Sequence, residues 1–136
     1  MRFIPYLFFS GDCAAAFQHY QQILGGELQV MTHAELPEGA QQMPGAKPQD
    51  VMHASLTFDD GQLMGSDDPT GDDGPKTGFA VAYSASNLQV GKQVFDALAE
   101  GGTVDMPFGA TDWSPGFGVC TDRFGMSWMV SSEGET

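Results

Sequence analysis

The first apolar run of the chain predicts a strand at its start. Residues 3–10 are almost continuously apolar and rich in aromatic side chains, which is typical of a strand buried on both faces. Pro5 lies within this run and has no N–H to donate to a strand ladder. The strand should therefore lie at the edge of a sheet, or its first residues should remain unpaired.

A helix follows, and its ends are marked by the sequence. Asp12 is a candidate N-cap for a helix over residues 12–24, and Gly25 stands where a C-terminal glycine is expected. Phe17 and Tyr20 recur at the spacing that places them on one helical face. The pattern predicts a helix that covers one face of a sheet.

The rest of the first half predicts three more strands. They lie at residues 27–36, 50–58 and 62–66, and the proline-rich segment 37–49 predicts a loop with one helical turn at 38–43. The last two strands flank Asp59-Asp60-Gly61, a hairpin turn in which the glycine should have a positive φ. The first half thus predicts the order β-α-β-β-β.

The second half repeats this order. It predicts a strand at 78–83, a helix at 87–100, a strand at 103–108, and a closing hairpin at 116–121 and 126–130, followed by a polar tail at 131–136. The acidic residues 67–76 predict a mobile loop between the halves. We therefore expect a single domain made of two tandem modules, at about 1–68 and 77–132.

Composition narrows the function. The chain has 136 residues, 5 Lys+Arg against 18 Asp+Glu, and a formal net charge of −13, so nucleic acids and anionic membranes are unfavourable partners. Residues 1–10 make a poor signal peptide, no apolar run has the length of a membrane span, and Cys13 and Cys120 lack metal-ligand or redox spacing. These features predict a soluble cytoplasmic protein with reduced thiols.

Three ordered motifs resemble a known family. They are P-Y-L-F-F-S-G-D-C-A-A-A-F-Q-H-Y-Q-Q-I-L-G-G-E near the start, M-H-A-S-L-T-F-D-D-G-Q-L-M-G-S-D in the middle and T-D-W-S-P-G-F-G-V-C-T-D-R-F-G-M-S-W near the end. Together they resemble the PhnB-like branch of the vicinal oxygen chelate superfamily, which includes glyoxalases, bleomycin resistance proteins and dioxygenases. The resemblance implies an α+β fold in which two βαβββ modules form a curved, partly open mixed β-barrel with helices outside, within a homodimer that can exchange modules. Members of this branch are often labelled similar to 3-demethylubiquinone methyltransferase, but no glycine-rich nucleotide loop follows the first strand here.

The resemblance also implies positions for a metal site. Superfamily enzymes hold a divalent ion with a His or Gln from the first strand and a Glu from the last strand of each module. Aligned through the turn glycines, these positions fall on Pro5 and Phe79 in the first strands and on Gly65 and Met129 in the last strands. None of these residues offers a nitrogen or oxygen ligand in its side chain, so we expect a protein without the inherited metal.

The candidate site residues line the expected cavity. His53 is either a general base or ligand contact with a pKa suited to neutral pH, or a structural histidine bonded to the backbone. Trp113 is either a lid over a ligand or core filler, whereas Trp128 and Cys120 are expected in the core, and His19 and His33 in solvent. The expected cavity wall and polar contacts are Phe9, His53, Met64, Ser66, Phe79, Tyr83, Trp113 and Met129.

Three functions remain open at this point. The first is the binding of a small hydrophobic or aromatic molecule in a metal-free cavity. The second is a lyase, isomerase or dioxygenase of the superfamily with His53 as general base. The third is a protein interaction module, which would have a filled interior.

Overall fold

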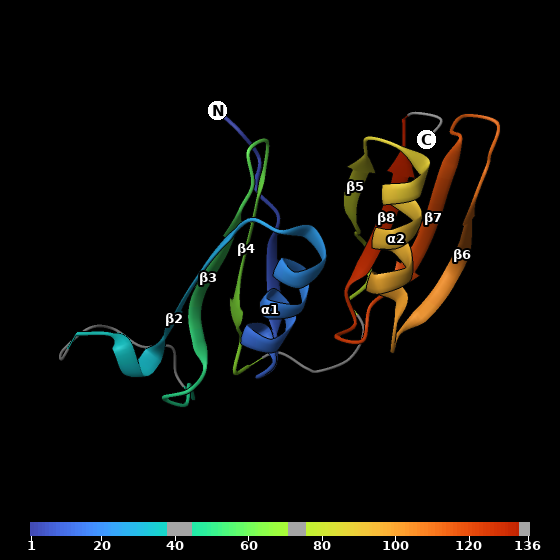
Figure 1. The fold of residues 1–136 in the computed structure, drawn as a ribbon. Helices are drawn as coiled ribbons and strands as arrows, with labels where there is room; N and C mark the ends of the chain where they lie inside the picture. The colour runs from blue at the N-terminus through green and yellow to red at the C-terminus, as the bar shows by residue number, and fades with distance from the viewer. Residues whose placement is uncertain (38–44, 71–75, 134–136) are drawn as a thin grey trace. The chain divides into compact units, whose positions relative to one another are not determined.

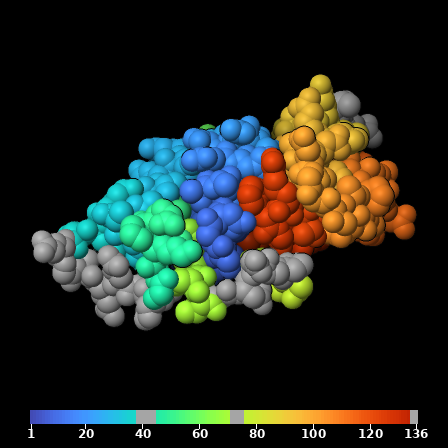
Figure 2. Space-filling view, turned by 90° about the horizontal axis from the view of Figure 1, so that it is seen from below, coloured from blue at the N-terminus to red at the C-terminus, as the bar shows by residue number. Residues whose placement is uncertain are grey.

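The chain folds into two compact units, each with one helix and four strands. The computed structural model describes residues 1–37, 45–70 and 76–133. Unit 1 is Met1–Asp73 and unit 2 is Gly74–Thr136, and both have the β-α-β-β-β order that the sequence predicts (Figure 1). The expected pair of βαβββ modules is confirmed. Figure 2 shows unit 1 in blue to green and unit 2 in yellow to red.

Unit 1 is an open mixed sheet with a helix on one face. Its elements in chain order are β1 (Tyr6–Phe9), α1 (Cys13–Leu24), β2 (Glu27–Thr32), the 3-10 turn η1 (His33–Glu35), β3 (Val51–Thr57) and β4 (Gln62–Asp67). The sheet order is β1-β4-β3-β2, with β1 parallel to β4 and the other pairs antiparallel. As expected, Pro5 precedes an edge strand, and its carbonyl accepts a hydrogen bond from the Met64 N–H at 3.1 Å.

Unit 2 repeats this topology. Its elements are β5 (Val81–Ala85), α2 (Leu88–Ala99), β6 (Thr103–Gly109), β7 (Gly116–Thr121) and β8 (Ser127–Ser132). The sheet order is β5-β8-β7-β6, with β5 parallel to β8 and the other pairs antiparallel. Each sheet is therefore open, with two edge strands.

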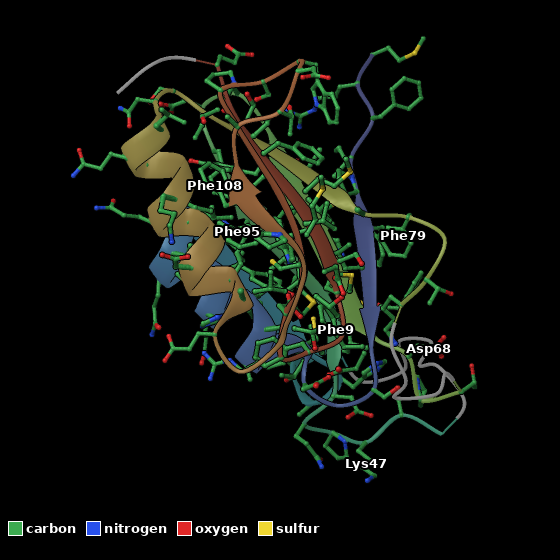
Figure 3. The ribbon with its side chains drawn as sticks, turned by 90° about the vertical axis from the view of Figure 1, so that its right-hand side faces the viewer. Phe9, Lys47, Asp68, Phe79, Phe95 and Phe108 are labelled. Carbon is green, nitrogen blue, oxygen red and sulfur yellow. The ribbon has the colours of Figure 1, made fainter. Side chains whose placement is uncertain are left out.

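The core of each unit lies between its helix and its sheet. In unit 1, the Phe9 and Phe17 rings meet edge to face with centroids 6.2 Å apart. In unit 2, Phe95 of α2 packs against Phe108 of β6 at 5.7 Å, and both are labelled in Figure 3. The buried apolar side chains are Leu7, Phe9, Cys13, Ala16, Phe17, Tyr20, Val51, Ala54, Leu56 and Leu63 in unit 1, and Val81, Ala85, Val94, Phe95, Leu98, Cys120, Met126, Trp128 and Val130 in unit 2.

The first strand is buried on one face and not on two. Leu7 and Phe9 are each 1% exposed, whereas Tyr6 is 39% and Phe8 50% exposed. The expectation of a strand buried on both faces is therefore wrong. A continuous apolar run has no alternation to reveal its exposed side, so the sequence pattern alone cannot distinguish the two cases.

The two helices begin in different ways. Asn87 caps α2 through its side chain, which accepts a hydrogen bond from the Val90 N–H at 2.9 Å. Asp12 occupies the N-cap position of α1 as predicted, but its side chain makes no capping hydrogen bond. Asp67, at the end of β4, accepts from the Gly11 and Cys13 N–H groups instead, at 2.9 and 3.0 Å.

Asp67 does not belong to the loop that the sequence predicts over residues 67–76. The sequence places it at the start of a mobile segment, but it belongs to β4 and is 2% exposed. Its second oxygen accepts from the Val51 N–H at 2.8 Å. Asp67 therefore links the start of α1, the start of β3 and the end of β4.

The closing hairpin turns around a second buried carboxylate. Asp122 is 3% exposed and accepts hydrogen bonds from the Phe124 and Met126 N–H groups and from the Trp128 indole, at 2.9 to 3.0 Å. Gly125 has a φ of 87°, which suits glycine. Gly61 does not have a positive φ, so that detail of the first hairpin is wrong. The placement of Trp128 in the core is confirmed by its 1% exposure.

Some predicted boundaries shift or cannot be compared. The predicted strand 27–36 ends at Thr32 and continues as η1, the predicted strand 78–83 is β5, Val81–Ala85, and the predicted tail 131–136 begins inside β8. The predicted helical turn at 38–43 lies outside the described residues, as does the part of the acidic loop at 71–75. In the described part of the chain, no helix combines the length and the hydropathy that a membrane span requires.

Candidate functional site

Each sheet has one face covered by its helix and another that we call the open face. A Cβ added at Gly65 would stand 2.8 Å from the Phe17 ring, so this position of β4 points toward α1. A Cβ at Gly118 would similarly stand 2.7 Å from the Phe95 ring of α2. Because side chains alternate along a strand, the neighbours of these glycines point to the open faces.

The open face of unit 1 carries aromatic, thioether and polar side chains. The residues paired across its strands are Tyr6 with Met64, Met64 with Ser55, Phe8 with Ser66, and His53 with Met31. Phe8 is 50% and Met31 42% exposed. This face therefore offers apolar surface around a few polar groups.

Tyr6 and His53 form a polar pair on this face. The Tyr6 hydroxyl lies 3.3 Å from His53 Nδ1, and the two ring centroids are 5.8 Å apart. The Phe8 ring, also on β1, lies 5.2 Å from the Tyr6 ring. The Tyr6 ring therefore neighbours both an aromatic ring of its own strand and the imidazole of β3.

The residues predicted for the site in unit 1 fall on both faces. His53 and Met64 are half-buried on the open face, and Ser66 lies there as well with 4% exposure. Phe9 points the other way, because its ring packs on Phe17 of α1. Phe9 is therefore a core residue of unit 1 and does not line the open face.

The open face of unit 2 is more apolar. Met129 is paired with Val119, and Val119 with Met106, so the three side chains form a row across the sheet. Trp113 is 70% exposed and contacts the Phe117 ring edge to face at 5.7 Å. These residues place an indole, a phenyl ring and thioethers on one surface.

The other predicted residues of unit 2 lie elsewhere. Phe79 precedes β5 and is 50% exposed (Figure 3). Tyr83 is paired with the buried Val130, which places it on the helix side of β5. Of the residues predicted in this unit, Met129 lies on the open face and Trp113 contacts Phe117 of that face.

The strand register corrects the alignment between the two halves. Four residues separate the paired Thr57 and Gln62 in the first hairpin, whereas five separate Thr121 and Ser127 in the second. The last strands therefore correspond with an offset of 65, since 127 − 62 = 65. Met129 thus corresponds to Met64 and not to Gly65.

The first strands also have a different register. Tyr6 is paired with Met64 and Ala82 with Met129, so Tyr6 corresponds to Ala82. Pro5 and Phe79 both precede their strands. The matched open-face positions are then Tyr6, Met64, Ala82 and Met129, which offer no imidazole or carboxylate.

These residues do not fit the metal site that the superfamily uses. Zinc and related ions are bound through imidazole, thiolate or carboxylate groups. Within residues 1–37, 45–70 and 76–133, no cluster of three or more His, Cys, Asp or Glu side chains has the geometry to hold an ion. We derive no chemical step through a metal.

Neither cysteine is suited to act as a nucleophile. Burial, together with the nearby Asp67 and Asp12, raises the pKa of the Cys13 thiol. Burial and the nearby Asp122 and Asp105 raise the pKa of Cys120 to about 11. Both thiols are therefore protonated at neutral pH, as expected for an inert buried cysteine.

His33 was expected in solvent, and that expectation is wrong. It lies in η1 with 2% exposure, and neither of its ring nitrogens has a hydrogen-bond partner. The backbone fixes its position, because the His33 N–H donates to the Asp50 carbonyl at 3.0 Å.

Sequence reasoning missed several residues of the open faces. The sequence pattern identifies Tyr6 and Phe8 only as part of an apolar strand, and Phe117 only as part of a hairpin. Pro5 indicates an edge strand, but it does not indicate which face of that strand is exposed. The pairing of Tyr6 with His53 spans 47 residues and has no local signature.

Comparison with known proteins gives consistent matches over the whole chain. A family model described as 3-demethylubiquinone-9 3-methyltransferase matches residues 1–131. Protein YjdN of Escherichia coli (strain K12) is 33% identical over 135 residues, which cover 93% of this chain and 92% of YjdN. Protein PA1353 from Pseudomonas aeruginosa is 39% identical in sequence, with a TM-score of 0.85 and 98% of each chain covered.

More distant structures share the fold. The PhnB protein from Bacillus cereus has a TM-score of 0.79 at 24% identity, over 97% of this chain and 99% of that one. A glyoxalase/bleomycin resistance protein/dioxygenase family enzyme from Burkholderia phytofirmans PsJN has a TM-score of 0.64 at 14% identity, over 95% of each chain. These likenesses show that the chain shares its fold with both proteins.

Proposed function

The chain belongs to the PhnB-like family, whose model is described as 3-demethylubiquinone-9 3-methyltransferase, and we propose that it binds a small hydrophobic or aromatic molecule without a metal ion. The observation that carries this proposal is the apolar character of the open faces. Tyr6, Phe8 and Met31 are exposed in unit 1, as are Trp113 and Met129 in unit 2. Exposed apolar side chains that gather on one surface are typical of a binding site.

The expected binding free energy follows from the apolar surface that the ligand buries. A flat two-ring molecule that buries about 150 Å² of apolar surface gains about 4 kcal/mol at ~25 cal/mol per Å². That corresponds to a dissociation constant of about 1 mM before any hydrogen bond is added. Binding of a purely apolar probe should therefore be weak and is best followed by NMR.

Methyl transfer receives no support from the residues of this chain. Dinucleotide-type cofactors bind at a glycine-rich turn between a strand and a helix. The corresponding turn here, between β1 and α1, is Ser10-Gly11-Asp12, and it has a single glycine.

The experiment uses methionine methyl groups as reporters. Protein labelled with ¹³C at the methionine methyls is titrated with naphthalene, with assignments from Met→Leu variants. We expect shifts at the open-face Met31, Met64 and Met129, and none at Met126, which is 0% exposed in the core. Shifts confined to Met126, or no shift at the solubility limit of naphthalene, would contradict the proposal.

A second candidate function is an enzyme with His53 as general base. It is favoured by the Tyr6 hydroxyl, 3.3 Å from His53 Nδ1. When Nδ1 carries the proton and donates to the Tyr6 oxygen, Nε2 is left to accept a proton from a substrate. A bound compound should then be converted by the wild type and left intact by His53→Ala, and equal conversion by both would exclude this role.

A further inference from the structure

The Tyr6–His53 pair lies beside apolar side chains of the open face. Tyr6 is paired across the sheet with Met64, and His53 with Met31. The Phe8 ring, 5.2 Å from the Tyr6 ring on the same strand, adds a second aromatic group to this surface. A planar molecule lying on these rings and thioethers would have its edge or substituent next to the hydroxyl and the imidazole.

Unit 2 shows that the fold does not need this pair. By the strand register, Ala82 corresponds to Tyr6 and Phe117 corresponds to His53, since β7 follows β3 with an offset of 64 (121 − 57). The sheet order and pairing are nevertheless the same in both units. The fold forms without this hydrogen-bonded pair in unit 2. The pair in unit 1 is therefore better explained by recognition of a ligand than by stability.

We propose that the Tyr6–His53 pair selects a neutral aromatic molecule that carries a hydroxyl group, a phenol. This inference rests on the proposed function, because it names the ligand class of the same open face. The pair offers one donor and one acceptor to a ligand in either imidazole tautomer, because the shared proton lies on Tyr6 or on Nδ1. A hydroxyl group both donates and accepts, so in either state it can form a hydrogen bond with the Tyr6 oxygen or with His53 Nε2.

Charge favours a neutral ligand over an anionic one. The chain carries a formal net charge of −13, with only 5 Lys+Arg, so its field repels carboxylates and phosphates. A phenol with a pKa near 10 remains neutral at pH 7. The pair can then contribute hydrogen bonds without an unfavourable charge on the ligand.

The test compares three probes of the same two-ring shape. Binding of 2-naphthol, naphthalene and 2-naphthoate is measured at pH 7 from the ¹³C-methyl shifts of Met31 and Met64. We expect 2-naphthol to bind about 3- to 10-fold more tightly than naphthalene, the range of one net hydrogen bond. We expect 2-naphthoate to bind no better than naphthalene.

Two variants separate recognition from folding. Tyr6→Phe removes the hydroxyl and should abolish the preference for 2-naphthol, while the affinity for naphthalene changes less than about 2-fold. Tyr83→Phe removes a hydroxyl from the helix side of β5 and should keep the preference. Circular dichroism and thermal unfolding check that both variants fold.

The remaining outcomes would contradict the role of the pair, the phenol assignment or the proposed function. If wild type binds 2-naphthol and naphthalene equally, or Tyr6→Phe keeps the preference, the role of the pair is wrong and the proposed function stands. If 2-naphthoate binds best, the ligand is not neutral and the phenol assignment is wrong. If no probe shifts Met31 or Met64, the proposed function fails at this face together with the inference.

Discussion

Asp67 gives the sharpest prediction about the stability of unit 1. Its carboxylate accepts three backbone hydrogen bonds, from Gly11 and Cys13 on one oxygen and from Val51 on the other. The sequence instead marks Asp12 as the cap of α1, although its side chain makes no capping hydrogen bond. Comparing the stability of Asp67→Ala with that of Asp12→Ala therefore tests which of the two carboxylates stabilises the start of α1.

The expected magnitudes differ clearly. Asp67→Ala leaves three N–H groups without their acceptor, each costing about 1–3 kcal/mol when it stays dry, and partial hydration near the exposed Gly11 lowers the sum to about 3–5 kcal/mol. Asp67→Asn keeps one acceptor oxygen and should cost about 1–3 kcal/mol. Asp12→Ala should cost less than about 1 kcal/mol, since only its charge near the helix N-terminus is lost.

The assay is urea unfolding followed by far-UV circular dichroism. Both tryptophans, Trp113 and Trp128, lie in unit 2, so indole fluorescence reports on that unit separately. Amide hydrogen exchange at Cys13 and Val51 should accelerate in Asp67→Ala. The reasoning is refuted if Asp12→Ala destabilises the protein as much as Asp67→Ala, or if the exchange of these amides is unchanged.

Three further predictions rest on the structure, and a fourth, the homodimer, rests on the family resemblance. Gly65→Ala should destabilise the protein by about 1–3 kcal/mol in urea unfolding, because its Cβ would stand 2.6 Å from the Leu7 carbonyl oxygen. Gly61→Ala should change the stability by less than about 1 kcal/mol, because nothing lies within 4 Å of its Cβ. Equal effects of the two substitutions would contradict the packing. The pKa of Cys120 is about 11 in the folded protein and about 8.5 in the unfolded chain, so the folded protein should stay unreactive toward iodoacetamide at pH 8. The contribution of this protonated thiol to stability should be complete below about pH 8.5 and be lost as the pH rises toward about 11. Rapid labelling of the folded protein would contradict this. Light scattering after size exclusion should give the mass of a homodimer of the 14.5 kDa chain, and a monomer at all concentrations would refute that expectation. Elemental analysis of protein purified without added ions should find no stoichiometric divalent metal, and a full complement would refute the metal-free proposal.

The elements were largely predictable because their signals are local. Glycine after a helix, apolar residues at helical spacing and a D-R-F-G turn each act within a few residues. These signals gave α1, α2 and the closing hairpin with small boundary errors. The cap of α1 was missed because its acceptor, Asp67, is 54 residues from Cys13 in the chain, and no local pattern encodes that contact.

The open-face residues were harder to predict than the core. Phe9 and Phe8 are adjacent aromatic residues in the same apolar run, yet Phe9 is 1% and Phe8 50% exposed. Their faces are fixed by the pairing of β1 with β4, more than fifty positions away. Residue type alone could not assign either of them to a binding surface.

A single residue in a turn decides how the two halves should be compared. The second hairpin has one more turn residue than the first, and an alignment anchored on Gly61 and Gly125 ignores it. Because side chains alternate along a strand, a slip of one residue moves every side chain to the opposite face. With the correct register, Met64 and Met129 occupy matching positions on the open faces, and Gly65 lies beneath α1. Both open faces thus have a methionine at the matching position, whereas only the open face of unit 1 has the Tyr6–His53 pair. This pair is therefore the first place to look for ligand specificity.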